Sequence, residues 1–164
     1  MDRVVGSRAG ELRVGLISDT HGLLRPEALA FLAGSDHVVH AGDVGDPSIL
    51  EALAAIAPVT AIRGNVDTDA WASRLPETTR AVIGGVTLYV LHDLAALDIK
   101  PHARGIRVVV YGHSHKASVS ERDGVLYVNP GSAGPRRFRL PVTAAELRID
   151  GSSVTAHIQE LAPG

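Results

Sequence analysis

The chain has 164 residues, of which 45% are hydrophobic and 21% are charged, as expected for one globular domain with its own core. Its formal net charge of -2 gives no general reason to expect nucleic acid or an anionic membrane as a partner. The sequence contains no cysteine, which excludes disulfides, thiolate metal sites and cysteine nucleophiles. Any transition-metal site must therefore use imidazole, carboxylate, carbonyl or amide ligands.

The start of the chain carries no targeting signal of the secretory type. Residues 1–11 are polar and contain glycine, without the apolar core of a signal peptide, so we expect a flexible leader ahead of a single domain over residues 12–164. No stretch approaches the ~20 apolar residues that a membrane helix needs. We therefore expect a cytoplasmic protein with no membrane partner.

Strands and helices alternate through the first part of the chain. Pro26 and Gly34 bracket a helix-forming segment, with proline in the first turn and glycine as the stop. Strand–helix–strand repeats of this kind argue for a parallel sheet with right-handed crossovers. The predicted strands are 12–18, 37–41 and 59–62, and the predicted helices are 26–33 and 47–56.

Hairpin signals dominate from Thr79 onward. Gly84-Gly85 is a two-residue turn between apolar runs, and Asp150-Gly151 marks another turn near the end. Residues 71–75 and 94–103 are weakly helical. A parallel half and a hairpin-rich half predict an α/β domain with two packed sheets and helices outside. The predicted strands are 80–83, 86–91, 107–111, 117–121, 125–128, 144–149 and 153–161.

Five segments end in residues that can bind metal. Ligand sites gather beyond the carboxyl ends of strands in open α/β sheets. Taken singly, each ending has a structural explanation, such as a helix cap for Asp43 or a turn for Asn65. Together they supply the ligands of a two-cation site, in which one carboxylate bridges the ions and a hydroxide between them is the nucleophile. The endings are Asp19-Thr20-His21, Gly42-Asp43, Gly64-Asn65, His92-Asp93 and Gly112-His113-Ser114-His115.

This set of motifs, in this order, resembles the calcineurin-like metallophosphoesterases. The short length, Gly64-Asn65-Val66-Asp67 and Asn129-Pro130-Gly131-Ser132 resemble the small prokaryotic phosphodiesterase branch of that family. The resemblance runs from about Leu12 to Ser132. It implies a four-layer α-β-β-α sandwich, with two mixed β-sheets flanked by helices and the metals at the strand ends.

The resemblance also divides the ligands between two divalent cations. Mn²⁺ is favoured, and Ni²⁺, Fe²⁺ or Zn²⁺ also suit nitrogen and oxygen ligands. The expected reaction is hydrolysis of a small phosphate ester, with a diester favoured over a monoester by resemblance alone. Asn65, Asp43 and His92 are the expected catalytic residues. The Asn65 amide can bind metal through its oxygen while its NH2 donates to phosphate. One ion is assigned to Asp19, His21 and His115, the other to Asn65, His92 and His113, and Asp43 bridges them.

Two positions depart from the family pattern. Larger members carry a histidine directly after the motif asparagine, suited to protonating the leaving group, and Val66 stands there in this chain. We therefore expect a preference for esters with good leaving groups, such as aryl esters. The small branch has glycine and histidine after the position of His92, whereas this chain has Asp93 and Leu94.

Several further residues are assigned around the metals. Arg136 and Arg137 could bind substrate phosphate or could be solvated surface residues. His40 and Asp67 are expected to lie behind the ligands and to orient them. Asn129-Pro130-Gly131-Ser132 is either a structural turn or a wall of the site.

Two other classes of function fit the same resemblance. The fold also serves, without catalysis, as a protein-binding subunit of the retromer coat, but that use does not require the full ligand set found here. Some relatives cut DNA, yet the short chain and slight negative charge argue against nucleic acid as the substrate. The strands of the hairpin half would suit a homodimer.

Overall fold

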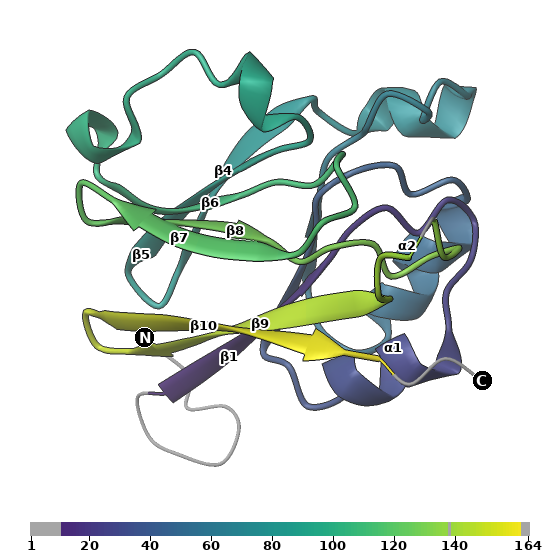
Figure 1. The fold of residues 1–164 in the computed structure, drawn as a ribbon, viewed down its shortest axis with the longest axis horizontal. Coiled ribbons are helices and arrows are strands. Elements are labelled where there is room, and N and C mark those ends of the chain that lie inside the picture. The colour runs from purple at the N-terminus through teal and green to yellow at the C-terminus, as the bar shows by residue number, and fades with distance from the viewer. Residues whose placement is uncertain (1–10, 138, 162–164) are drawn as a thin grey trace.

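The computed structural model describes residues 11–137 and 139–161, which form two five-stranded mixed β-sheets packed face to face (Figure 1). The expected leader over residues 1–11 lies outside the described residues except for Glu11, which is the first residue of β1. No helix in the described part of the chain is long and apolar enough to cross a membrane.

The first sheet has the strand order β10-β9-β1-β2-β3. Its three parallel strands are connected by α1 and α2, as the alternating pattern predicted, and β9 pairs antiparallel with β1. Proline begins each helix, and the Asp46 side chain caps α2 by accepting from the Ser48 N–H. The elements are β1 (Glu11–Ile17), α1 (Pro26–Leu32), β2 (His37–His40), α2 (Pro47–Ala54), β3 (Val59–Ala61), β9 (Thr143–Asp150) and β10 (Ser153–Glu160).

The second sheet has the strand order β4-β5-β6-β8-β7. The pairs β5–β6 and β6–β8 are parallel, while β4 and β7 pair antiparallel with their hairpin partners. Three short 3₁₀ helices lie in its connections. The elements are η1 (Ala70–Arg74), β4 (Thr78–Ile83), β5 (Val86–Leu91), η2 (Leu94–Ala96), η3 (Pro101–Arg104), β6 (Ile106–Val110), β7 (Ser118–Arg122) and β8 (Val125–Asn129).

Three apolar clusters separate the layers. Val14 and Leu16 of β1 pack between the two sheets, whereas Ile17 faces the opposite side, where Leu32 of α1 and Leu53 of α2 cover the first sheet. The third cluster lies on the outer face of the second sheet under the segment that contains η2 and η3. The expected four-layer α-β-β-α sandwich is therefore confirmed, with short 3₁₀ helices in the outer layer over the second sheet (Figure 1).

The parallel first part and the hairpins of the later part are both present, but the two parts of the sequence do not each form one sheet. The hairpin β9–β10 joins the first sheet beside β1, and the second sheet contains three mutually parallel strands. The helical segment expected over residues 94–103 is likewise two separate 3₁₀ turns, because Pro101 starts a new turn rather than continuing the first.

Candidate metal centre

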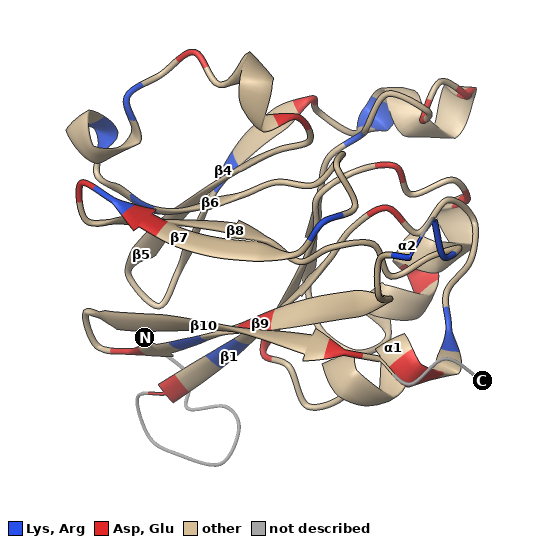
Figure 2. Ribbon diagram, viewed as in Figure 1, with Lys and Arg blue, Asp and Glu red and all other residues tan. Residues whose placement is uncertain are grey.

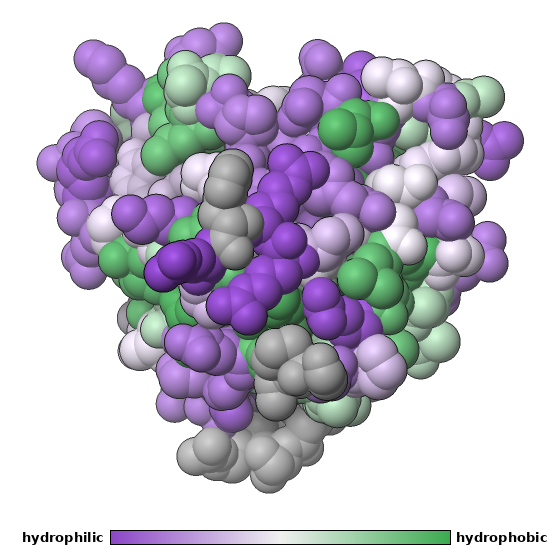
Figure 3. Space-filling model, turned by 45° about the vertical axis from the view of Figure 1, so that its right-hand side comes forward, coloured by the Kyte–Doolittle hydropathy of each residue, from purple (hydrophilic) through white to green (hydrophobic). Residues whose placement is uncertain are grey.

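The carboxyl ends of parallel strands from both sheets meet at one edge of the sandwich. Because β1, β2 and β3 run parallel in one sheet and β5, β6 and β8 run parallel in the other, the polar residues that follow them are brought together. Figure 3 turns this side of the molecule forward, and strongly hydrophilic side chains form a band across the middle of that face.

Five of the predicted ligands form a compact cluster. Asp19 Oδ1 lies 3.7 Å from His21 Nε2, 3.5 Å from His115 Nε2 and 3.7 Å from His92 Nε2. Asp43 Oδ2 lies 3.6 Å from His21 Nε2 and 3.1 Å from His92 Nε2. Two groups of three can each offer ligand atoms within 4.8 Å of one another, namely Asp19 with His21 and His115, and Asp19 with Asp43 and His92.

Four predicted ligands in this cluster carry a buried side-chain atom without a hydrogen-bond partner. Buried side-chain polar atoms are nearly always hydrogen-bonded. Within the described residues, five buried side-chain atoms have no hydrogen-bond partner, and four of them belong to predicted ligands: Asp19 Oδ1, His21 Nε2, His92 Nε2 and His115 Nδ1. Carboxylate oxygens and imidazole nitrogens held this close fit a divalent cation.

Hydrogen bonding orients the His92 ring. Its Nδ1 donates to the Ala41 carbonyl oxygen at 2.8 Å, which leaves Nε2 without a proton in the neutral ring and directs it toward the two carboxylates. Burial lowers the pKa of His92, but the Asp43 carboxylate 3.1 Å away, the Ala41 carbonyl and the charge of Asp19 together raise it above its ordinary value.

Asp43 is held as a carboxylate. Burial alone would raise its pKa, but the contact with the His92 imidazole, the hydrogen bond from the Val66 N–H and the nearby charge of His21 together lower the pKa to about 2. The side chain contacts a predicted ligand of each ion, His21 and His92.

Most of these ligands sit in strained backbone. A positive φ is uncommon for residues with a side chain and costs of order 1 kcal/mol or more. Among the described residues, six non-glycine positions have positive φ, and five of them are predicted ligands: Asp19, His21, Asp43, His113 and His115. Gly64 and Gly112 permit the close approach of neighbouring loops, because a Cβ at either position would overlap the Asp43 or Asp19 region.

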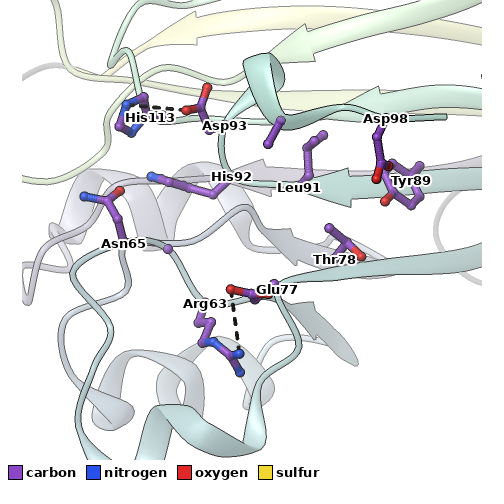
Figure 4. Close-up of a pocket in the computed structure, with 12 residues that line it drawn as sticks. Arg63, Asn65, Glu77, Thr78, Tyr89, Leu91, His92, Asp93, Asp98 and His113 are labelled. Atoms are coloured by element: carbon purple, nitrogen blue, oxygen red, sulfur yellow. Dashed lines mark ion pairs between the residues drawn. The ribbon is translucent and has the colours of Figure 1, made fainter.

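Asn65 and His113 lie at the side of the cluster. His113 is half-exposed, and its Nε2 is 3.9 Å from Asp93 Oδ2, while its ring contacts the His92 ring edge-on at 5.2 Å between centroids (Figure 4). The His113 N–H donates to Asp19 Oδ2. Asn65 follows β3, and its exposed side chain lines a cavity together with His92 and His113.

Asp67 joins two ligand-bearing loops. Its buried carboxylate accepts from the N–H of Gly64 at 2.9 Å, of Val44 at 3.0 Å and of Gly45 at 2.9 Å. It therefore holds the segment after Asp43 against the segment before Asn65, and its orienting role toward a metal stays a prediction.

Replacing Asp67 by asparagine should weaken both folding and metal binding. An amide NH2 would face backbone N–H donors, so at least one buried donor loses its acceptor at a cost of about 2 kcal/mol in unfolding free energy. Metal affinity should fall about 10–100-fold. Chemical denaturation and metal titration of Asp67→Asn measure both, and Asp69→Asn, an exposed position without a side-chain cap, is the matched control. Equal metal affinities in the two variants would contradict the role.

His40 lies buried behind the cluster. Its Nδ1 accepts from the Gly42 N–H, so Nε2 carries the proton and donates to Thr20 Oγ1, whose hydroxyl donates to the Val44 carbonyl. Burial lowers the pKa of His40 to about 4. The neutral ring thus fixes the backbone on either side of Asp19 and Asp43.

The buried neutral His40 should make stability depend on pH. The unfolded chain takes up a proton near pH 6.5, whereas the folded chain resists doing so until about pH 4. The unfolding free energy should therefore fall by about 3 kcal/mol as pH drops from 6.5 to 4, with no change from this group above 6.5. Denaturation of metal-free protein across this range measures the slope, which His40→Gln should reduce and His157→Gln, in the exposed edge of β10, should not. An unchanged slope in His40→Gln would rule this assignment out.

The two loop arginines are exposed and do not line the cavity. Figure 2 shows basic segments in the loop between β8 and β9, next to α2. Arg136 and Arg137 belong to this loop, and the charge of Arg137 contributes to a lowered pKa of His115, for which burial is the main cause. Their role toward substrate stays a prediction.

Sequence reasoning gave too little weight to Asn129. The buried Asn129 Nδ2 donates to the Gly112 carbonyl and to Ser114 Oγ, and its Oδ1 accepts from the Gly131 N–H. This side chain therefore anchors the loop that carries His113 and His115. An asparagine at the end of a buried strand was the available signal.

Comparison with known proteins places these features in context. A family model for the calcineurin-like phosphoesterase superfamily domain matches residues 12–152. A probable metallophosphoesterase of Methanothermobacter thermautotrophicus is 34% identical over 157 residues, which cover 88% of this chain and 90% of that protein.

Two solved structures share the fold. Vacuolar protein sorting 29 from Cryptosporidium parvum is 23% identical, with a TM-score of 0.80 and coverage of 94% of this chain and 93% of that one. A structure described as a novel archaeal phosphodiesterase is 21% identical, with a TM-score of 0.75 and coverage of 90% and 100%.

Proposed function

The chain belongs to the calcineurin-like phosphoesterase superfamily, and we propose that it is a metal-dependent hydrolase of small phosphate esters, acting on diesters in preference to monoesters. The proposed cofactor is a pair of divalent cations, with Mn²⁺ favoured. The observation that carries the proposal is the cluster of Asp19, His21, His92 and His115 where two sheets meet, in which each side chain has a buried polar atom without a hydrogen-bond partner.

The residues of the cluster have distinct proposed roles. Cations held there would lower the pKa of a bound water and offset negative charge on the phosphoryl group. Asp43 stays ionised and contacts ligands from both halves of the cluster. His92 presents Nε2 because Ala41 occupies Nδ1. The amide of Asn65 would donate from NH2 to a phosphate oxygen while its carbonyl faces a cation. His21 and His115 complete the ligand set beside Asp19.

One assay tests the proposal. Protein stripped of metal is offered bis(p-nitrophenyl) phosphate and p-nitrophenyl phosphate, with Mn²⁺, Ni²⁺, Fe²⁺ or Zn²⁺ restored one at a time. We expect no turnover without metal and faster turnover of the diester with Mn²⁺. Folded protein that is inactive with every metal on both esters would overturn the proposal in favour of a protein-binding scaffold.

The residue after Asn65 predicts a dependence on the leaving group. Val66 is 46% exposed and offers only its backbone N–H, which already donates to Asp43 Oδ1. Because this side chain cannot protonate a departing alkoxide, rates across a series of aryl and alkyl esters should fall as the leaving-group pKa rises. Replacing Val66 with histidine should flatten that dependence. A wild-type rate that does not vary with leaving-group pKa would contradict the prediction.

A further inference from the structure

A cavity of about 430 Å³ opens directly beside the metal cluster (Figure 4). Asn65, His92 and His113 line one end, and the cavity extends along β5 past Leu91 and Tyr89. The His92 side chain is only 7% exposed, and its Nε2 lies 3.1 Å from Asp43 Oδ2, so this end of the cavity adjoins the carboxylates of the cluster. A substrate whose phosphoryl group lies at the cluster would extend one ester arm into this space.

The charged groups along the cavity are mostly acidic. The lining contains three carboxylates, on Glu77, Asp93 and Asp98, and one guanidinium, on Arg63. The formal charge of these four groups is -2. Arg63 is already engaged, because Nη1 donates to the Leu75 carbonyl and Nη2 lies 3.9 Å from Glu77 Oε2.

Asp98 is the carboxylate most available to a ligand. Asp93 accepts from the Ala95 N–H and lies near His113, whereas Asp98 has no hydrogen-bond or ion-pair partner among the described residues. Figure 4 places Asp98 beside Tyr89, at the opposite end of the cavity from Asn65. An aromatic ring next to a free carboxylate is a suitable environment for an organic cation.

We propose that this cavity binds an ester arm bearing an ammonium group, so that the substrate is a phosphate ester of an amino alcohol. The inference rests on the proposed phosphoesterase function. Asp98 and Tyr89 would contact the cation, while Leu91 and Ala96 contact the intervening methylene groups. An anionic arm would meet the carboxylates without a free cation to compensate for them.

The test compares two phosphates of the same shape. Phosphocholine carries a quaternary ammonium, and 3,3-dimethylbutyl phosphate is its uncharged isostere. Titration calorimetry with Mn²⁺-loaded protein should show roughly ten-fold tighter binding of phosphocholine. Asp98→Asn should reduce that ratio to about three or less without weakening the neutral ligand. Asp123→Asn removes an exposed carboxylate from the β7–β8 turn outside this cavity and should leave the ratio unchanged.

The outcomes separate this inference from the function on which it rests. Equal affinity for the two phosphates in wild type, or a ratio that neither Asp98→Asn nor Glu77→Gln changes, would overturn the ammonium site. Hydrolysis of aryl diesters could continue in that case, and the proposed function would stand. Failure of folded, Mn²⁺-loaded protein to bind either phosphate would count against both.

Discussion

Replacing Asp43 by alanine should abolish metal-dependent hydrolysis, with a loss of roughly 10³-fold or more in kcat/KM. Asp43 is the carboxylate that contacts His21 on one side of the cluster and His92 on the other. Its pKa of about 2 means that the group supplies a full negative charge at neutral pH. Without it, two cations would be held near one remaining carboxylate, Asp19, and metal affinity should fall together with activity.

Unfolding free energies measured with and without Mn²⁺ distinguish loss of metal binding from loss of folding. Wild-type protein should gain about 2.7 kcal/mol in unfolding free energy when Mn²⁺ is present at 100 times its dissociation constant, and Asp43→Ala should gain much less. Asp46→Ala is the control, because Asp46 is an exposed aspartate three residues away that caps α2. A variant at Asp43 that binds two metal ions and turns over at the wild-type rate would remove the bridging assignment.

Asn65→Asp should separate metal binding from catalysis. The substitution keeps an oxygen that can bind a cation and replaces the NH2 donor with a second acceptor. We expect metal affinity close to that of wild type and a decrease of about 10²–10³-fold in kcat, the size seen when one donor to a developing oxyanion is removed.

The control for Asn65→Asp must add the same charge nearby. Thr68→Asp places a carboxylate on an exposed residue three positions away and should change kcat little. Metal content is measured directly on each purified protein, so that a low rate is not mistaken for a missing cofactor. Full turnover by the Asn65→Asp variant would show that the amide does not contact the phosphoryl group.

The family and the strand ends could be predicted from local patterns. Asp19 and His21 follow an apolar run that ends abruptly, and similar endings recur before Asp43, Asn65 and His92. Each of these endings consists of residues adjacent in the sequence, so it can be recognised without a structure. The match of the family model to residues 12–152 confirms the resemblance. Contacts between residues close in sequence, such as the hydrogen bond from the Gly64 N–H to Asp67, could also be predicted.

The features that could not be predicted from the sequence depend on pairing between strands far apart in the chain. The hairpin β9–β10 could join either sheet on local evidence, and its pairing with β1 follows from apolar faces that meet only in the folded protein. The cavity could not be predicted for the same reason. Glu77 precedes β4, Tyr89 lies on β5 and Asp98 follows η2, so their shared surface depends on how three connections fold back over one sheet.

The placement of the cluster also bears on how the two sheets stay together. Asp19 and Asp43 follow strands of one sheet, while His92 and His115 follow strands of the other. A cation shared by Asp19 and His115 would close a loop of 96 positions, counted as 115 minus 19, and such long closures restrict the unfolded chain most. The bound metal would then act as a cross-link between the two sheets at one edge of the sandwich, in a chain that has no cysteine. Apolar packing would stabilise the remainder of the contact between the sheets.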